Sequence, residues 1–164
     1  MQATITQLSE KKLVGNSLKM SLSADKTAAL WKSFMPLQKL IKHRVDSNLI
    51  AMQVYSKSLI FKDFNPQTEF TKCAMVSVHK FEDIPKELET RILEGGLYVV
   101  FIHKGAAKDF PKTANYIFNE WLPNSEYELD QRPHFEVLGA NYNPMDAQAE
   151  EEVWIPIKPV ASHS

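Results

Sequence analysis

The sequence contains only one cysteine, Cys73, which excludes a disulfide bond within the chain. A single free cysteine fits a reducing compartment, and residues 1–12 lack the apolar run of a signal peptide, so we expect a cytoplasmic protein. No apolar run reaches the roughly 18 residues that a membrane-spanning helix needs. A basic excess is also lacking, because 19 lysines and arginines stand against 20 aspartates and glutamates, which argues against a broad nucleic-acid-binding surface.

Several catalytic and cofactor motifs are missing as well. There is no Gly-x-Ser-x-Gly elbow, no Walker loop and no dinucleotide-binding fingerprint, so we expect no cofactor. The histidines lack the paired spacing of a zinc site, so we expect no metal. His103 follows a strongly apolar segment and is expected to be a strand-end histidine with a hydrogen-bond partner. Cys73 lies in a strand-like segment and is expected to be buried rather than reactive.

A length of 164 residues and a hydrophobic content of 44% indicate one domain with a substantial core. Apolar β-forming segments predict strands, and apolar residues at helical spacing predict two helices. The first helix has Ser23 or Asp25 as a cap and is interrupted at Pro36. The expected strands are 4–8, 13–20, 49–55, 70–78, 97–103, 135–139 and 153–157, and the expected helices are 28–41 and 110–121.

The order of a strand, a helix and further strands occurs twice, in pseudo-repeats of about residues 1–80 and 81–160, followed by a tail at 161–164. The two helices also end alike, in Phe34-Met35-Pro36 and Trp121-Leu122-Pro123. Each copy alone has a small core. We therefore expect the two copies to pack into one α+β domain, 1–160, with a ligand cleft between them.

The closing segment, Glu150 to Lys158, begins with three carboxylates and continues as a strand. Alternate side chains of a strand face opposite ways, so Glu152 and Trp154 share one face. These two residues line either a cavity that accepts a positive charge or a solvated sheet edge, and the strand alone leaves both interpretations open. Glu150 and Glu151 precede the strand and are expected to be solvated.

The chain carries more aromatic surface than a core of this size requires. Tryptophan and tyrosine need a partner for the N–H or O–H group when they are buried, which suits them to line a cavity. An aromatic wall with one carboxylate attracts organic cations. Alternatively, the same carboxylate has a raised pKa and acts as a general acid or base.

Four segments, in this order and spacing, resemble the GyrI-like effector-binding domains. Gly95 to Gly105 resembles the central strand of that family, Tyr116 to Ser125 its second helix, Arg132 to Glu136 the next strand and Glu152 to Ile157 its terminal strand. Such domains form the ligand-sensing part of AraC-type and MerR-type multidrug regulators and also occur alone. The resemblance implies two pseudo-symmetric strand-helix-strand-strand repeats, whose antiparallel sheets form a ligand groove backed by two helices.

The chain also departs from these relatives. Residues 1–160 leave no room for a DNA-binding helix-turn-helix, so direct DNA binding is not expected. His134 stands where the family pattern has a small, acidic or amide residue.

The resemblance implies that Glu152 lies at the bottom of an aromatic pocket, near Tyr98 and Trp121, and faces lipophilic cations. Our first hypothesis is a stand-alone sensor or sequestering protein for amphipathic, cationic aromatic compounds, which is not an enzyme. The expected ligand-binding residues are Glu152, Trp154, Trp121, Tyr98, Phe118 and Tyr55.

Two alternatives stay open. Some relatives resemble hydrolases of reactive electrophiles, in which case Glu152 acts as general acid or base and Tyr98 orients water or substrate. Other relatives inhibit DNA gyrase, which requires a protein-binding surface for which the sequence carries no marker. Turnover that disappears in Glu152→Gln distinguishes the hydrolase from a binding protein.

Overall fold

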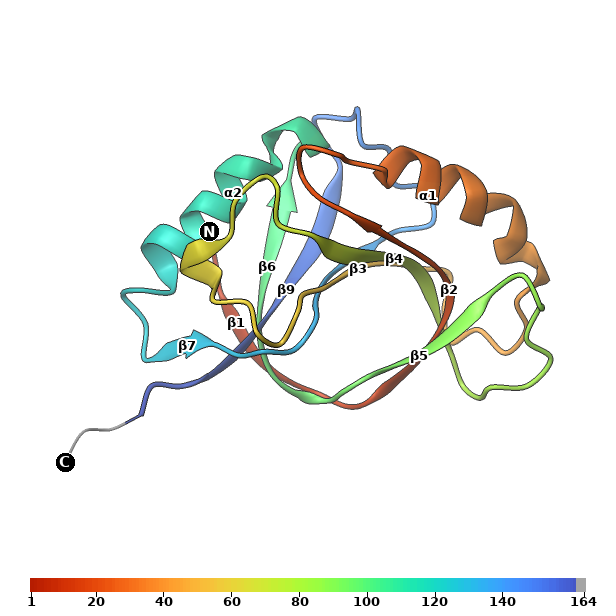
Figure 1. The fold of residues 1–164 in the computed structure, drawn as a ribbon, viewed down its shortest axis with the longest axis horizontal. Coiled ribbons are helices and arrows are strands. Elements are labelled where there is room, and N and C mark those ends of the chain that lie inside the picture. Colours follow the sequence, from red (N-terminus) through yellow and green to blue (C-terminus); the bar gives the residue numbers. More distant parts are fainter. Residues whose placement is uncertain (162–164) are drawn as a thin grey trace.

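The computed structural model describes residues 1–161 and shows an α+β fold, in which helices cover one side of a single curved antiparallel sheet (Figure 1). The strands are β1 (Thr4–Leu8), β2 (Lys11–Met20), β3 (Leu49–Val54), β4 (Phe70–Val78), β5 (Glu89–Leu93), β6 (Gly96–Lys104), β7 (Tyr127–Leu129), β8 (His134–Leu138) and β9 (Glu150–Pro159). Their order in the sheet is β1-β6-β9-β8-β3-β4-β2-β5, and β7 pairs with the last residues of β9. The predicted fold class is confirmed.

Both predicted helices are present. The helical segments are α1 (Thr27–Phe34), η1 (Met35–Leu40), η2 (Phe61–Asp63), η3 (Ala107–Asp109), α2 (Phe110–Tyr116) and η4 (Ile117–Trp121). The backbone N–H of Thr27 donates to the Asp25 carboxylate at 2.9 Å, as expected for a residue that precedes a helix. The α-helix gives way to the 3-10 helix η1 at Met35, directly before Pro36, which has no N–H to donate.

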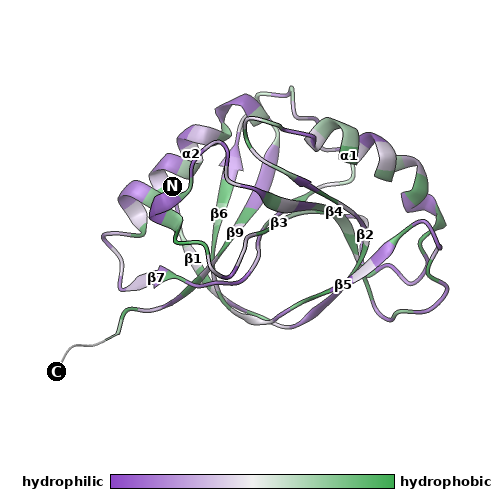
Figure 2. Ribbon diagram, viewed as in Figure 1, coloured by the Kyte–Doolittle hydropathy of each residue, from purple (hydrophilic) through white to green (hydrophobic). Residues whose placement is uncertain are grey.

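Each strand presents one face to the helices, called here the helix face, and the other to the inside of the curved sheet, called the inner face. On the helix face, Val153 and Ile155 of β9 form a buried cluster with Ile117 of η4. A second cluster joins Leu30 and Phe34 of α1 to strands β2, β3 and β4. Figure 2 shows that β9 begins with hydrophilic residues and then becomes hydrophobic.

The inner face is filled by its own side chains. Side chains with no exposed surface come from five strands, and they include Leu13, Cys73, Met75, Leu93, Tyr98 and Phe135. The sheet curls until the β1–β2 and β5–β6 links meet (Figure 1). Gly95 lies at this meeting, where a Cβ atom would stand 2.6 Å from the carbonyl oxygen of Leu8, so a side chain has no room. The predicted burial of Cys73 is confirmed.

The strands β5 and β7 are absent from the sequence prediction. Both are short and partly exposed, so neither carries the apolar alternation that marks a strand. The division into two pseudo-repeats stays a prediction, and the predicted tail lies outside the described residues except for Ala161. Within the part of the chain that the structure describes, no helix is long and apolar enough to cross a membrane.

Candidate functional site

The three consecutive glutamates of β9 have three different environments. Glu150 is exposed, Glu151 is only 8% exposed on the helix face, and Glu152 is partly exposed on the inner face. The prediction that Glu151 is solvated is therefore wrong. Strand β9 begins at Glu150, earlier than expected, and pairing with β6 and β8 on both sides buries Glu151 opposite His103 and Leu138.

The residues expected around Glu152 are brought together in part. The indole Nε1 of Trp154 donates to the Glu152 carboxylate at 3.0 Å. The Trp154 ring stacks on Phe135 with centroids 5.2 Å apart and meets the edge of Tyr98 at 5.9 Å. Tyr98 in turn donates its hydroxyl proton to the carbonyl oxygen of Pro133 at 2.8 Å. The predicted neighbours Glu152, Trp154 and Tyr98 thus form one inner-face group.

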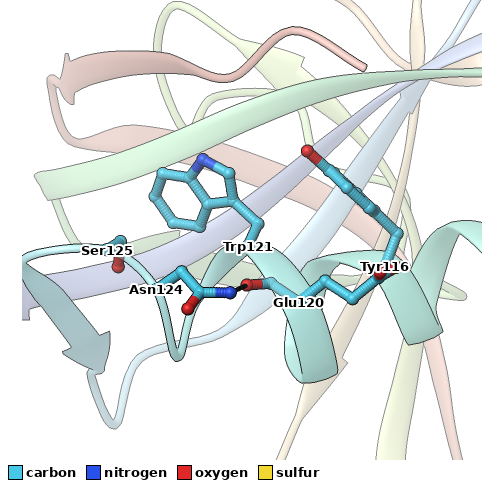
Figure 3. Close-up of a pocket in the computed structure, with 5 residues that line it drawn as sticks. All are labelled: Tyr116, Glu120, Trp121, Asn124 and Ser125. Atoms are coloured by element: carbon cyan, nitrogen blue, oxygen red, sulfur yellow. Dashed lines mark hydrogen bonds between the residues drawn. The ribbon is translucent and has the colours of Figure 1, made fainter.

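Trp121 lies on the other side of the sheet, so its predicted proximity to Glu152 is wrong. Its ring meets Phe101 at 5.4 Å and stacks on Tyr127 at 6.4 Å, within the helix-face core. It also lines a surface pocket of about 280 Å³ with Tyr116 (Figure 3). The physical reason is the pleat of β6, which turns Phe101 toward the helices and Tyr98 away from them.

Two carboxylates face the helices at the centre of the sheet. Glu136 of β8 lies opposite Val153 and Glu151 of β9 lies opposite Leu138, so the two are diagonal neighbours, and we call them the acid pair. The pKa of Glu136 is raised to about 7, chiefly by burial and also by the charge of Glu151, while Lys72 lowers it. Burial also raises the pKa of Glu151. Glu136 is absent from the predicted site residues, although a glutamate inside an apolar strand could have indicated a functional carboxylate.

Two tyrosines lie beside the acid pair. Burial and the charge of Glu136 raise the pKa of Tyr55, at the end of β3. Burial and the charge of Glu151 raise the pKa of Tyr142, in the β8–β9 loop, to about 12. The two carboxylates share one nearby ammonium group, that of Lys72. The result is a negative centre with an aromatic group beside each carboxylate.

Tyr55 also belongs to a group of four rings that includes Phe118, so these two predicted site residues lie together. We call Tyr55, Phe61, Phe118 and His134 the ring cluster. The centroid of the His134 ring lies 5.0 Å from that of Tyr55, 5.2 Å from that of Phe61 and 6.1 Å from that of Phe118. The cluster is next to the acid pair, because His134 and Glu136 are alternate residues on the helix face of β8.

Two buried histidines, His103 and His134, differ in their hydrogen bonding. His103 has Nδ1 2.6 Å from the Thr113 hydroxyl and Nε2 3.2 Å from the carbonyl oxygen of Ala106, which confirms its predicted partner. His134 is 4% exposed, and its Nε2 has no hydrogen-bond partner among residues 1–161. Burial lowers the pKa of His134 to about 3. His134 is therefore a neutral ring with an unused hydrogen-bonding atom.

A cavity of about 300 Å³ adjoins the ring cluster. Its lining includes Tyr55 and Phe61 of that cluster, Val54 of β3 and the charged side chains Arg91 and Arg132. The charges on this lining are paired in part, since Arg91 lies 3.3 Å from the Glu89 carboxylate and Arg132 lies 2.8 Å from that of Asp130.

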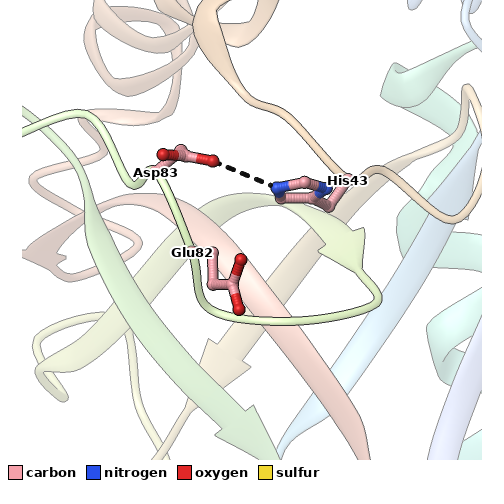
Figure 4. Close-up of side chains that lie close together, drawn as sticks. All are labelled: His43, Glu82 and Asp83. Carbon is pink, nitrogen blue, oxygen red and sulfur yellow. Dashed lines mark hydrogen bonds and ion pairs between the residues drawn. The ribbon is translucent and has the colours of Figure 1, made fainter.

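One further group has the composition of a metal site. His43, Glu82 and Asp83 offer ligand atoms within 4.8 Å of one another, and Nε2 of His43 lies 3.3 Å from the Asp83 carboxylate (Figure 4). Glu82 already pairs with Lys80 at 3.2 Å, and both carboxylates are exposed. Exposed groups of this kind are common without an ion, so we assign no metal to it.

The raised pKa of Glu136 predicts a pH-dependent stability. Between the ordinary value of 4.5 and about 7, the folded chain keeps a proton on Glu136 that the unfolded chain loses, so stability falls as pH rises. His134 acts in the opposite direction, because the unfolded chain protonates it first. The comparison that isolates Glu136 is therefore Glu136→Gln against wild type. We expect the free energy of unfolding of the variant, relative to that of the wild type, to rise by about 1–3 kcal/mol between about pH 5 and pH 8, measured by urea unfolding. A constant difference across this range would contradict the assignment.

The sequence matches the family model of the GyrI-like small molecule binding domain over residues 1–158, which confirms the resemblance. A search of curated protein sequences gave no match.

Among solved structures, the fold is similar to SAV2435 bound to tetraphenylphosphonium, at 16% identity over 96% of this chain and 94% of that chain, with a TM-score of 0.73. It is similar to the EcmrR C-terminal domain, at 16% identity over 97% of this chain and 98% of that chain, with a TM-score of 0.69. It is also similar to a hydrolase from Listeria innocua, at 11% identity over 96% and 92%, with a TM-score of 0.57. At these identities the structural likeness shows the fold alone, whereas the family model spans nearly the whole chain, and the chain therefore belongs to the family of GyrI-like small molecule binding domains.

Proposed function

We propose that this chain binds amphipathic aromatic cations, and that the acid pair attracts their positive charge. The supporting observation is that Glu136, which is partly exposed, and Glu151, which is 8% exposed, lie on neighbouring strands and share one nearby ammonium group, that of Lys72. Burial raises the pKa of both carboxyl groups. A carboxylate whose charged form is disfavoured by burial gains from an added opposite charge. Tyr55 and Tyr142 add the attraction of aromatic faces for cations. Tetraphenylphosphonium, the compound bound to the structurally similar SAV2435, is a cation of this kind.

Glu152 stays the alternative carboxylate for the same function. It is partly exposed, and Trp154 already donates a hydrogen bond to it. The inner face beside it is filled by Phe135 and Tyr98, neither of which has exposed surface. Glu136 is also partly exposed, but burial raises its pKa and that of Glu151, so a cation gains more beside these two carboxylates and we rank the acid pair first.

A second candidate function is hydrolysis of a reactive electrophile. The pKa of Glu136, about 7, suits a general acid or base near neutral pH. A hydrolase from Listeria innocua has a similar fold. Product formation that stops in Glu136→Gln favours the hydrolase, whereas saturable binding without product favours the binding protein.

Titration with tetraphenylphosphonium tests the proposed function. We expect saturable binding, followed by the fluorescence of the three tryptophans. Triphenylphosphine oxide has similar aromatic groups but no net charge, so we expect it to bind at least about tenfold more weakly. Equal affinity for the two compounds would show that the positive charge does not contribute to binding, and would overturn the proposed function.

A further inference from the structure

The loop between β3 and β4 places one of its own rings over the unpartnered histidine. Phe61, the first residue of η2, stacks on His134 with ring centroids 5.2 Å apart and planes inclined by 10°. Phe61 also stacks with Phe64 at 10° and with Phe118 at 17°. The edge of Tyr55 meets it at 4.8 Å. The Phe61 ring is therefore the centre of a set of flat groups drawn from several parts of the chain.

This ring also separates His134 from the neighbouring cavity. Phe61 and Tyr55 line the cavity of about 300 Å³ and contact His134, whereas His134 does not line the cavity. A buried polar atom without a hydrogen bond costs roughly 1–3 kcal/mol, and native proteins rarely keep one. Nε2 of His134 is such an atom.

We propose that Phe61 occupies an aromatic subsite of this protein, and that a planar aromatic cation displaces it and donates an N–H hydrogen bond to Nε2 of His134, whose own proton then lies on Nδ1. This inference rests on the proposed function. A ring in the place of Phe61 lies beside Tyr55, which is close to both His134 and Glu136. Its charge then faces the acid pair while its N–H group faces His134.

The segment that carries Phe61 is suited to move. Residues 55–69 form no strand, and η2 is a single short 3-10 turn within them. The adjacent Ile60 is 57% exposed and the other two residues of η2 are exposed, so displacement of this turn removes mainly the packing of Phe61 and of Phe64, which follows it. The cavity provides the space next to it.

A first test needs no ligand. Diethyl pyrocarbonate modifies neutral histidine nitrogens that it can reach, and peptide mass spectrometry reports each histidine separately. We expect His134 and His103 to react slowly in the wild type, and the exposed His79 to react quickly. Phe61→Ala should speed the modification of His134 by about tenfold or more, because the stacked ring no longer covers it, and should leave His103 unchanged. In the matched variant Ile60→Ala both rates should stay as in the wild type. An unreactive His134 in Phe61→Ala overturns the proposal.

A second test uses 1-methylquinolinium and its 4-amino derivative, which are both planar cations, although only the amino compound has N–H donors. We expect the wild type to prefer the amino compound by about tenfold, because it satisfies the buried nitrogen. His134→Phe keeps a flat ring and removes that nitrogen, so the preference should vanish. Phe61→Ala should bind both cations more tightly by about fivefold, since its own ring no longer has to leave, and Ile60→Ala should not.

The two proposals fail in different ways. Tight binding of both quinolinium cations, with no preference and no response to His134→Phe, overturns the subsite and leaves the proposed function intact. Equal binding of tetraphenylphosphonium and triphenylphosphine oxide overturns the proposed function. The reactivity of His134 in Phe61→Ala then still decides whether Phe61 covers a site.

Discussion

Tetraphenylphosphonium should bind about 30-fold or more weakly when Glu136 and Glu151 are both replaced by glutamine, a loss of at least about 2 kcal/mol. Glutamine keeps the length and shape of the side chain, so the loss reports the removed charge. The effect is large because burial raises the pKa of both carboxyl groups, and a cation that pairs with them is screened by water less than it would be on an exposed surface. Binding of triphenylphosphine oxide should change little. Isothermal titration calorimetry on both proteins measures the difference.

The neighbouring glutamates of β9 supply matched controls on the same strand. Glu150→Gln changes an exposed carboxylate and should leave affinity unaltered. Glu152→Gln changes the carboxylate that Trp154 contacts on the inner face, and we expect a loss below about threefold. If Glu152→Gln instead causes the large loss and the double variant does not, the ligand site is the one inferred from sequence and the acid pair is not part of it.

Phe135→Ala should lower the free energy of unfolding by about 3–5 kcal/mol, the usual cost of emptying a phenylalanine site in a core. Phe135 has no exposed surface and lies at the centre of the inner face. Its ring contacts Tyr98 at 5.3 Å and Trp154 at 5.2 Å, so its loss leaves a cavity between two large aromatic groups. Urea unfolding followed by tryptophan fluorescence measures the change.

Ile92→Ala is the control for this stability prediction. Ile92 lies on the edge strand β5 and is 54% exposed, so its truncation should cost less than about 0.5 kcal/mol. A cost below about 1 kcal/mol for Phe135→Ala would mean that the inner face is not a packed core. Such a face would be free to hold a ligand beside Glu152, and our ranking of the two carboxylate sites would reverse.

Periodicity along the chain predicted most of the fold. The long strands and both helices were recognised because apolar residues repeat at the spacing that each structure requires, and Pro36 marks the change from α1 to η1. The shared face of Glu152 and Trp154 follows from the same alternation and is confirmed by their hydrogen bond. The partner of His103 was also expected from its place at the end of an apolar strand.

Periodicity along the chain could not predict whether each carboxylate is buried or exposed. Alternation separates the two faces of β9, but it does not say which face the helices, loops and neighbouring strands cover. Glu151 was assigned to solvent because three glutamates in a row resemble a charged lead-in. It is buried because β6 and β8 pair on both sides of it. Trp121 was assigned to the same pocket as Glu152 from the family resemblance, which does not say on which face of the sheet the Trp121 ring packs.

The candidate site itself depends on contacts between distant segments. Tyr55 and His134 are far apart in the sequence, and the pairing of β3 with β8 brings their rings to 5.0 Å. The acid pair forms because β8 and β9 are neighbours in a particular register. Local periodicity thus sufficed for both helices and for the strands other than β5 and β7, and the order of four short segments sufficed for the resemblance to the family, since these features depend on residues close in sequence. Which carboxylates lose their water, and which ring covers His134, was decided only by the tertiary structure, because burial is a property of the segments that meet in space.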